Sequence, residues 1–432
     1  MLTNRPLFRR LVGNSLWQIG DKAFRTAGGV LIGIYIARYL GPADFGLLSF
    51  ATAIAALFGA VAALGLPSIV VRDLVSRPQD RAAVLASALL LRLAGGAIAT
   101  VLAYCAAVLL REGDARTWAI VAIVAISNLP QAWDIVDYDY QARMHAKPIA
   151  LSRDIGFLAT SLLRIGLVFS RAPLVWFAWA ITIESTLSAL LMAMLWRVDN
   201  LSVPLSRVTR REIKKLFLAS WPLLIAGLSV SIYMRLDQIM IGRMLGNAAV
   251  GMFSAAVRIS EALYFIPIAV TASLAPALTA MHQKSAPVYA AQTARFTRFL
   301  VYMALAIAVV FSAFSTRLVA ALYGLPYAGA APVLAIHTWA GVFVSLGVSG
   351  SLWLTNAGYL KYAMYQTLAG AAVNAGLNIL LIPKFGIIGA AFATCIGQFV
   401  SVVAMIAAWR KTRPLFWLQL SSLWPRVSAI RD

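Results

Sequence analysis

The dominant pattern along the chain is a series of long apolar segments separated by short clusters of charge, glycine or proline. Twelve segments are long enough, at about 20 residues, for a helix to cross a ~30 Å hydrocarbon core. Six of them precede a basic stretch in the middle of the chain, and six follow it. We predict membrane-spanning helices over 11–38, 43–66, 83–110, 116–136, 149–170, 173–196, 216–242, 248–280, 297–322, 329–354, 361–382 and 387–409.

Composition supports this prediction, because apolar residues make up 61% of the chain and charged residues only 12%. The charged share is about half that of a soluble protein, too little to cover a soluble exterior. We therefore predict an all-α, polytopic membrane protein. The two cysteines, Cys105 and Cys395, lie inside apolar segments without paired spacing, so neither a disulfide framework nor a metal site is expected. No motif calls for a cofactor.

The net charge of +21 follows from basic clusters between the apolar segments rather than from a basic soluble domain. With the N-terminus in the cytoplasm, twenty-four Lys and Arg fall on the cytoplasmic side and seven on the other side. This bias predicts that both termini are cytoplasmic, and it excludes nucleic acid as the expected partner. Asp21 and Lys22 interrupt the first apolar segment, and no clear cleavage site follows. We expect that segment to be a retained membrane helix rather than a signal peptide.

The two halves of the chain repeat each other weakly. A shift of 205 residues places 37–43 on 242–248, and both stretches share an Arg-x-Leu-Gly order that ends at Gly41 and Gly246. We expect each of these glycines to end a helix in a tight turn. A shift of 214 residues gives a second match, for 164–184. Both shifts pair each helix with the sixth one after it, so the halves are predicted to be parallel repeats related by a pseudo-two-fold axis.

The predicted organisation is two six-helix bundles that face each other across a cavity, which is typical of transporters. The expected parts are an N-terminal bundle (1–197), a basic cytoplasmic linker (198–215), a C-terminal bundle (216–410) and a cytoplasmic tail (411–432).

Ten of the charged residues inside the predicted spans are candidates for a function, because a charge costs about 2.5–3.5 kcal/mol at mid-bilayer unless it is paired or functional. They are Asp21, Lys22, Arg25, Arg92, Arg164, Glu184, Arg235, Asp237, Arg258 and Glu261. Six are basic and four are acidic, and the basic excess favours a phosphate-bearing ligand held by charge-assisted hydrogen bonds. The six basic residues are therefore the candidate substrate-binding residues. The four acidic residues are candidates for coupling transport to H⁺ or Na⁺.

A structural role is open for four of these charges. Asp21 and Arg25 are spaced i,i+4, and Arg258 and Glu261 are spaced i,i+3, so each pair can meet on one helix face. The repeat does not copy any of the ten charges, although it copies the turn. That difference favours a function for the charges, because scaffold residues should recur in both halves.

The first fifty residues resemble the opening of a known family. Asn14-Ser15-Leu16-Trp17, then Lys22 and Arg25, and then Ala37-Arg38-Tyr39-Leu40-Gly41-Pro42 with Phe45-Gly46 look like the polysaccharide-unit (O-antigen-type) flippases. These flippases belong to the multidrug/oligosaccharidyl-lipid/polysaccharide (MOP) exporter superfamily.

The resemblance implies a cavity lined by the first, second, seventh and eighth helices, with Lys22, Arg25, Arg235 and Arg258 in its wall. The implied cargo is an oligosaccharide unit on undecaprenyl pyrophosphate, moved across the bacterial inner membrane for surface polysaccharide synthesis. Membrane lipids and other polysaccharide assembly proteins are the further partners implied. Arg92 and Arg164 are candidates from the charge argument alone.

Three alternatives stay open. A drug/cation antiporter of the same superfamily is disfavoured by the basic excess. A membrane glycan polymerase or ligase would carry a long periplasmic loop, whereas the predicted non-cytoplasmic loops are short, so the chain is not expected to be an enzyme. A scaffold that recruits glycan-assembly enzymes is compatible with the sequence.

Overall fold

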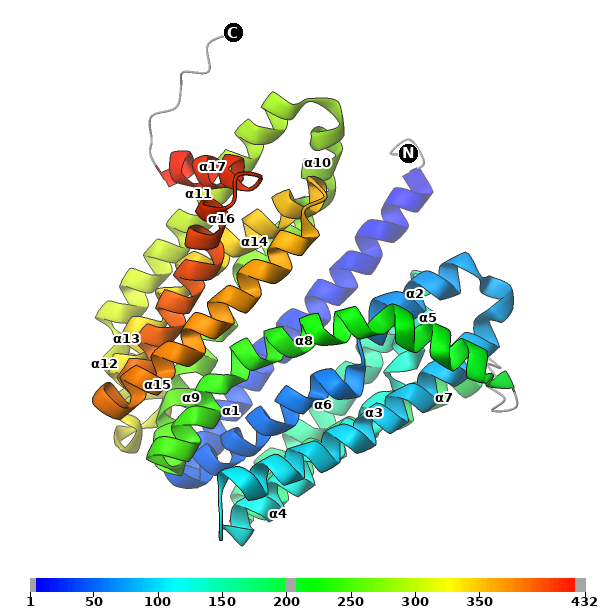
Figure 1. The fold of residues 1–432 in the computed structure, drawn as a ribbon. Helices are drawn as coiled ribbons and strands as arrows, with labels where there is room; N and C mark the ends of the chain where they lie inside the picture. The colour runs from blue at the N-terminus through cyan, green and yellow to red at the C-terminus, as the bar shows by residue number, and fades with distance from the viewer. Residues whose placement is uncertain (1–4, 199–206, 424–432) are drawn as a thin grey trace. The chain divides into compact units, whose positions relative to one another are not determined.

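The computed structural model describes residues 5–198 and 207–423, and over these residues it consists of helices without a β-strand (Figure 1). The helices of the first part are α1 (Arg5–Ala63), α2 (Leu66–Ser76), α3 (Arg81–Leu110), α4 (Ala115–Ala125), α5 (Ile135–Ala142), α6 (Ala146–Phe169), α7 (Leu174–Val198) and α8 (Arg210–Leu245). Short 3₁₀ turns η1 (Pro78–Asp80), η2 (Ile126–Asn128) and η3 (Pro130–Asp134) lie between them.

The remaining helices are α9 (Asn247–Leu263), α10 (Phe265–Lys284), α11 (Ala286–Ala313), α12 (Ser315–Tyr323), α13 (Ala330–His337), α14 (Ala340–Asn356), α15 (Leu360–Phe399), α16 (Met405–Ala408) and α17 (Arg413–Leu423). A 3₁₀ turn, η5 (Leu325–Tyr327), precedes α13, and a π-helical turn, η6 (Val400–Ala404), continues α15.

The chain forms two compact units, Met1–Arg235 and Leu236–Asp432, and the division falls inside α8. The bundle limits expected from the sequence stay a prediction. Residues 199–206 of the predicted linker and 424–432 of the predicted tail lie outside the described residues. Part of the predicted tail forms α17, which packs against α11 and α14, and Arg298 Nε donates to the Ser422 carbonyl at 2.9 Å.

The prediction of a polytopic helical membrane protein is confirmed. Nine segments of the described chain are long and apolar enough to cross a membrane. Two of them, Gly20–Ser76 and Lys361–Ala408, each overlap two of the spans predicted from sequence. The charged helix α6 is not among the nine, but it coincides with the predicted span 149–170. All twelve predicted spans therefore have a helical counterpart.

Helix starts reproduce the internal repeat. α3 and α11 begin 205 residues apart (81 and 286), while α6 and α15 begin 214 residues apart (146 and 360). Gly41 and Gly246 occupy matching breaks, with φ of 71° and 90°. A positive φ is costly for residues with a Cβ atom, which explains why both turns have glycine at this position. The predicted turns are confirmed.

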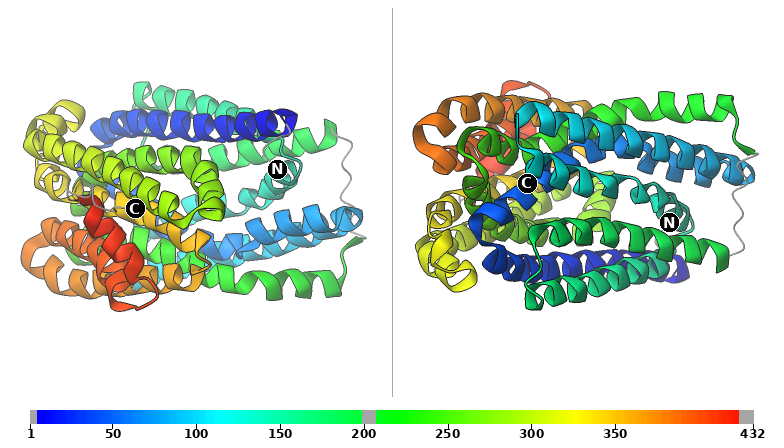
Figure 2. Two further views of the ribbon diagram at one scale, coloured as in Figure 1. Left: turned by 90° about the horizontal axis from the view of Figure 1, so that it is seen from above. Right: turned by 90° about the horizontal axis from the view of Figure 1, so that it is seen from below.

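In the first unit α1 is the central helix. It packs against α3, α4 and α6, and α6 packs in turn against α7 (Figures 1 and 2). The second unit places α11 against α14, α9 against α13, and α13 and α14 against α15.

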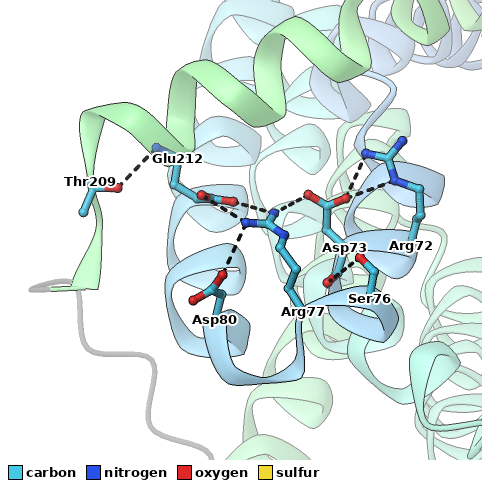
Figure 3. A network of polar contacts seen from close by, with 7 residues as sticks. All are labelled: Arg72, Asp73, Ser76, Arg77, Asp80, Thr209 and Glu212. Carbon is cyan, nitrogen blue, oxygen red and sulfur yellow. Dashed lines mark hydrogen bonds and ion pairs between the residues drawn. The ribbon is translucent and has the colours of Figure 1, made fainter.

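The start of α8 is fixed to the α2–α3 turn by a network of ion pairs (Figure 3). Arg77 Nη2 lies 2.8 Å from Glu212 Oε1 and also contacts Asp73, and its Nη1 is 3.5 Å from Asp80. The hydrogen bond to Glu212 raises the pKa of Arg77, with further contributions from Asp73. Thr209 Oγ1 caps α8 by accepting from the Glu212 amide at 3.2 Å. These contacts tie the last part of the predicted linker, which forms the first turn of α8, to the α2–α3 turn.

Candidate functional site

The charged segment of α1 forms an internal ion pair. Arg25 Nε donates to Asp21 Oδ1 at 2.7 Å, and its Nη2 donates to Asp21 Oδ2 at 2.9 Å. This two-point geometry fits the planar guanidinium to a carboxylate. The i,i+4 spacing predicted that the two residues could meet, and the structure confirms it. Asp21 is buried, whereas the Arg25 side chain is 35% exposed.

Lys22, the next residue along α1, is exposed. Within residues 5–198 and 207–423 no carboxylate pairs with it. It therefore differs from Asp21 and Arg25, which neutralise each other.

Arg92 and Arg164 find partners on other elements. Arg92 is 2% exposed, and its Nη2 lies 2.8 Å from Asp134 Oδ2 and also donates to the Gln131 carbonyl. Arg164 Nη2 on α6 lies 2.7 Å from Glu184 Oε2 on α7. The sequence left both arginines without a nearby partner, because the carboxylates lie 42 and 20 residues further along the chain.

The acidic stretch of η3 and α5 was not among the predicted site residues. Its carboxylates meet basic residues of neighbouring elements: Arg153 Nη2 lies 2.9 Å from Asp137 Oδ2 and 3.7 Å from Asp134 Oδ1. Arg81 Nε lies 2.6 Å from Asp139 Oδ1. The signal in the sequence is three aspartates within 134–139, at the end of the predicted span 116–136 and in the loop that follows it.

A cavity of about 280 Å³ in the first unit lies among these charges, and we call it the α1–α7 pocket. It lies between α1, η2, η3, α6 and α7. Its wall consists of Arg25, Ser127, Pro130, Gln131, Asp134, Arg153, Ile181, Glu184, Ser185, Ser188, Ala189 and Met192. Two basic and two acidic side chains thus face one space, and each has an ion-pair partner in the protein.

The other predicted site residues lie on α8 and α9. Arg235 is the last residue of the first unit, and it is half-buried. Arg258 and Glu261 are also half-buried, on α9 of the second unit. All three take part in polar or electrostatic contacts.

Asp237 lies at the centre of a buried polar cluster in the second unit. It is 6% exposed, its Oδ1 accepts from Asn378 Nδ2 at 2.5 Å, and its Oδ2 accepts from Thr394 Oγ1 at 2.5 Å. Asn378 Nδ2 also donates to Asn374 Oδ1 at 3.1 Å. Asn378 Oδ1 and Asn374 Nδ2 are buried without a hydrogen-bond partner among the described residues. The sequence singled out Asp237 but not the α15 residues that surround it.

This cluster has the chemistry of a site for a proton or a small monovalent cation. No basic side chain of the described chain pairs with Asp237, so its carboxylate is held by neutral donors only. An unpaired buried carboxylate is costly, and it is relieved by protonation or by a cation. Carboxylate, amide and hydroxyl oxygens are the ligands that hard cations prefer.

Comparison with solved structures identifies the fold. The chain is similar to a multidrug resistance MATE family transporter of the MOP superfamily in its inward-facing conformation, with a TM-score of 0.76, 17% identity, and coverage of 92% of this chain and 96% of that chain. It is similar to the lipid II flippase MurJ in an inward closed conformation, with a TM-score of 0.72, 15% identity, and coverage of 94% and 90%. A MOP superfamily transporter from Pyrococcus furiosus gives a TM-score of 0.57 at 16% identity, with coverage of 96% and 95%.

Sequence comparison is more local. A stretch of 100 residues is 34% identical to an uncharacterized membrane protein of Methanocaldococcus jannaschii, and this match spans 23% of the chain and 20% of that relative. Residues 25–282 match the polysaccharide biosynthesis protein family, which confirms the family resemblance of the N-terminal motif. Because this match covers more than half of the chain and the fold is that of the MOP transporters, the chain belongs to the polysaccharide biosynthesis protein family of multi-pass membrane proteins.

Proposed function

We propose that this protein is a flippase for lipid-linked oligosaccharides. It moves units carried on undecaprenyl pyrophosphate across the bacterial inner membrane for surface polysaccharide synthesis, with both termini in the cytoplasm. The family match and the MOP fold support a role in moving a lipid-linked precursor. The basic bias of the predicted cytoplasmic segments supports the orientation.

Lys22 is the observation that carries the proposal. It lies in the predicted span 11–38, near the start of the apolar segment Gly20–Ser76, and the described chain gives it no carboxylate partner. An ammonium group inside a membrane costs up to about 2.5–3.5 kcal/mol, the value at mid-bilayer, unless an anion or water compensates it. The pyrophosphate of a lipid carrier supplies such an anion.

Arg25 supports Lys22 one turn further along α1. Its bond to Asp21 uses Nε and Nη2, which leaves donors on Nη1 for a phosphate oxygen. Arg235 and Arg258 are further candidates for the cargo site, from the family resemblance. Arg92 and Arg164 fit a structural role better, because Arg92 is buried and Arg164 is half-buried, each against a carboxylate.

The Asp237 cluster supports coupling to H⁺ or Na⁺. Among the described residues no basic side chain pairs with Asp237, while Asp21 and Glu184 are both ion-paired. We propose that uptake of a proton or a sodium ion by Asp237, with Asn374, Asn378 and Thr394 as its neighbours, accompanies transport. Glu261 is retained as a weaker candidate.

The test is complementation of a strain in which this gene is deleted. Lys22→Ala should reduce surface polysaccharide at least tenfold and make lipid-linked units accumulate on the cytoplasmic side, at unchanged membrane levels of the protein. Lys384→Ala is the matched control, because Lys384 is also exposed without a described partner. Normal export by the Lys22 variant would refute the site.

The same strain separates the alternatives. Accumulation of free sugars or nucleotides in place of lipid-linked units would point to an enzyme. Unchanged glycan export together with sensitivity to cationic drugs would point to an antiporter.

A further inference from the structure

The α1–α7 pocket lies in the first unit, and the flippase proposal uses only one residue of its wall, Arg25. Its volume of about 280 Å³ is far larger than a single ion or water requires, since one water occupies only about 10–15 Å³ of such space. It lies just below the range of about 300–1,000 Å³ found for small-molecule sites. The pocket therefore has room for a compact molecule about the size of one sugar ring.

The charges of the wall are balanced inside the protein. Arg25 is paired with Asp21, and Arg153 is paired with Asp137. The two acidic members, Asp134 and Glu184, are paired with Arg92 and Arg164. A bound phosphate would face Asp134 and Glu184, and a bound cation would face Arg25 and Arg153. A neutral ligand avoids both conflicts, because it adds no charge to a wall whose charges are already compensated.

The polar atoms of the wall suit a ligand rich in hydroxyl groups. The guanidinium groups and the Gln131 amide donate hydrogen bonds, and the carboxylates of Asp134 and Glu184 accept them. A hydroxyl group both donates and accepts, so a ring of hydroxyls can satisfy donors and acceptors that lie side by side. Sites built to bond a hydroxyl also reject molecules that lack it, because their own polar groups are then left unpaired.

One part of the wall is apolar. Pro130, Ile181, Ala189 and Met192 contribute carbon surface beside the charged residues. A pyranose ring presents a face of C–H groups together with its hydroxyls, and this mixture matches the wall. A small inorganic ion makes no favourable contact with such an apolar surface.

We propose that the α1–α7 pocket binds a neutral sugar residue of the transported unit. The proposal rests on the proposed function, since it assigns part of the same cargo to this pocket. It separates two tasks, with the pyrophosphate held at Lys22 and one sugar recognised between α1, η3, α6 and α7.

The test uses the full chain purified in detergent and saturation-transfer NMR. The probes are methyl glycosides of common neutral hexoses and N-acetylhexosamines, compared with glucuronic acid and glucose 1-phosphate. We expect at least one neutral glycoside to bind with millimolar affinity, independently of Na⁺, and the two anionic sugars to bind at least tenfold more weakly.

Two variants locate the binding. Ala189→Leu places three extra carbons in the pocket wall, and it should weaken the glycoside signal at least tenfold. Ala193→Leu, one turn further along α7 and outside the wall, is the matched control and should change the signal less than twofold. Gln131→Ala removes a side-chain amide without adding bulk, and should weaken binding at least threefold if Ala189→Leu fails to fold.

The proposal is overturned if no neutral glycoside binds, if the anionic sugars bind as well as the neutral ones, if Na⁺ displaces the sugar, or if the pocket variants bind like the control. These outcomes are separate from the complementation result. Export restored by a chain that binds no sugar would remove the pocket assignment and leave the flippase. Sugar binding without export would refute the flippase proposal and leave the assignment of the pocket.

Discussion

The ion pair between Arg164 on α6 and Glu184 on α7 allows a quantitative test of whether intramembrane charges hold the first unit together. The guanidinium and the carboxylate are 2.7 Å apart, and the two side chains are 13% and 30% exposed. Charges about 4 Å apart interact by about 4 kcal/mol at an effective dielectric constant of 20. Because Glu184 is partly exposed, water weakens this interaction. We therefore expect a coupling energy of about 2 kcal/mol, which lies between the values for exposed pairs and for fully buried pairs.

The measurement is a double-mutant cycle with Arg164→Met, Glu184→Gln and the double variant, each unfolded reversibly by SDS in mixed micelles. Either single change should destabilise the protein more than the double change does, because each leaves one partly buried charge unpaired. The control cycle uses Arg116 and Asp44, whose side chains are 62% and 33% exposed at a similar distance of 2.9 Å. That pair should couple by less than about 1 kcal/mol. Equal coupling energies in the two cycles would refute the assignment of Arg164 and Glu184 as a structural pair.

Two further predictions concern the first unit. Gly65→Ala should destabilise the protein by well over the about 1–2 kcal/mol that a positive φ costs, because the added Cβ would lie 2.5 Å from the Ser220 carbonyl oxygen. Gly113→Ala is the control, because Gly113 also has a positive φ but lies in open space, so this variant should show the φ cost alone. Equal melting temperatures for the two variants would contradict this prediction. Asp114 caps α4, and although burial opposes it, hydrogen bonds from Thr117 lower the pKa of Asp114 below 3.8. A carboxyl group whose pKa is lowered by folding stabilises the folded state above its unfolded pKa of 3.8. This stabilisation is lost as the pH falls through the lowered pKa. Asp114→Ala should therefore cost about 1 kcal/mol at pH 7 and less at pH 3, measured by thermal unfolding, and a cost that grows toward pH 3 would contradict the assignment.

The fold could be predicted well because membrane helices are encoded locally. A run of apolar residues is enough to identify a span, and the positions of the twelve spans all coincide with helices. The predicted span boundaries were less exact where a helix extends beyond the run of apolar residues. The span predicted over 297–322 corresponds to α11, which begins at Ala286, just before Pro287, and ends at Ala313. Gln292, Thr293 and Arg295 interrupt the apolar run in its first turns, so the predicted span began only after them.

The site could be predicted only as far as its contacts are local. The pairing of Asp21 with Arg25 follows from helical periodicity alone. The partners of Arg92 and Arg164, and the neighbours of Asp237, come from distant segments that only tertiary packing brings together. For the same reason the basic excess in the spans overstated the free positive charge, since it counted arginines whose carboxylates lie elsewhere in the chain.

The pairing of Arg164 with Glu184 also bears on how the chain enters the bilayer. A helix that crosses with an unpaired charge meets a barrier of about 2.5–3.5 kcal/mol at mid-membrane. α1 carries both members of its own pair, Asp21 and Arg25, so this pair needs no second helix. α6 and α7 each carry one member, and only residues 170–173 separate them. These two helices therefore cross most favourably as one hairpin, with their opposite charges already joined inside the translocon.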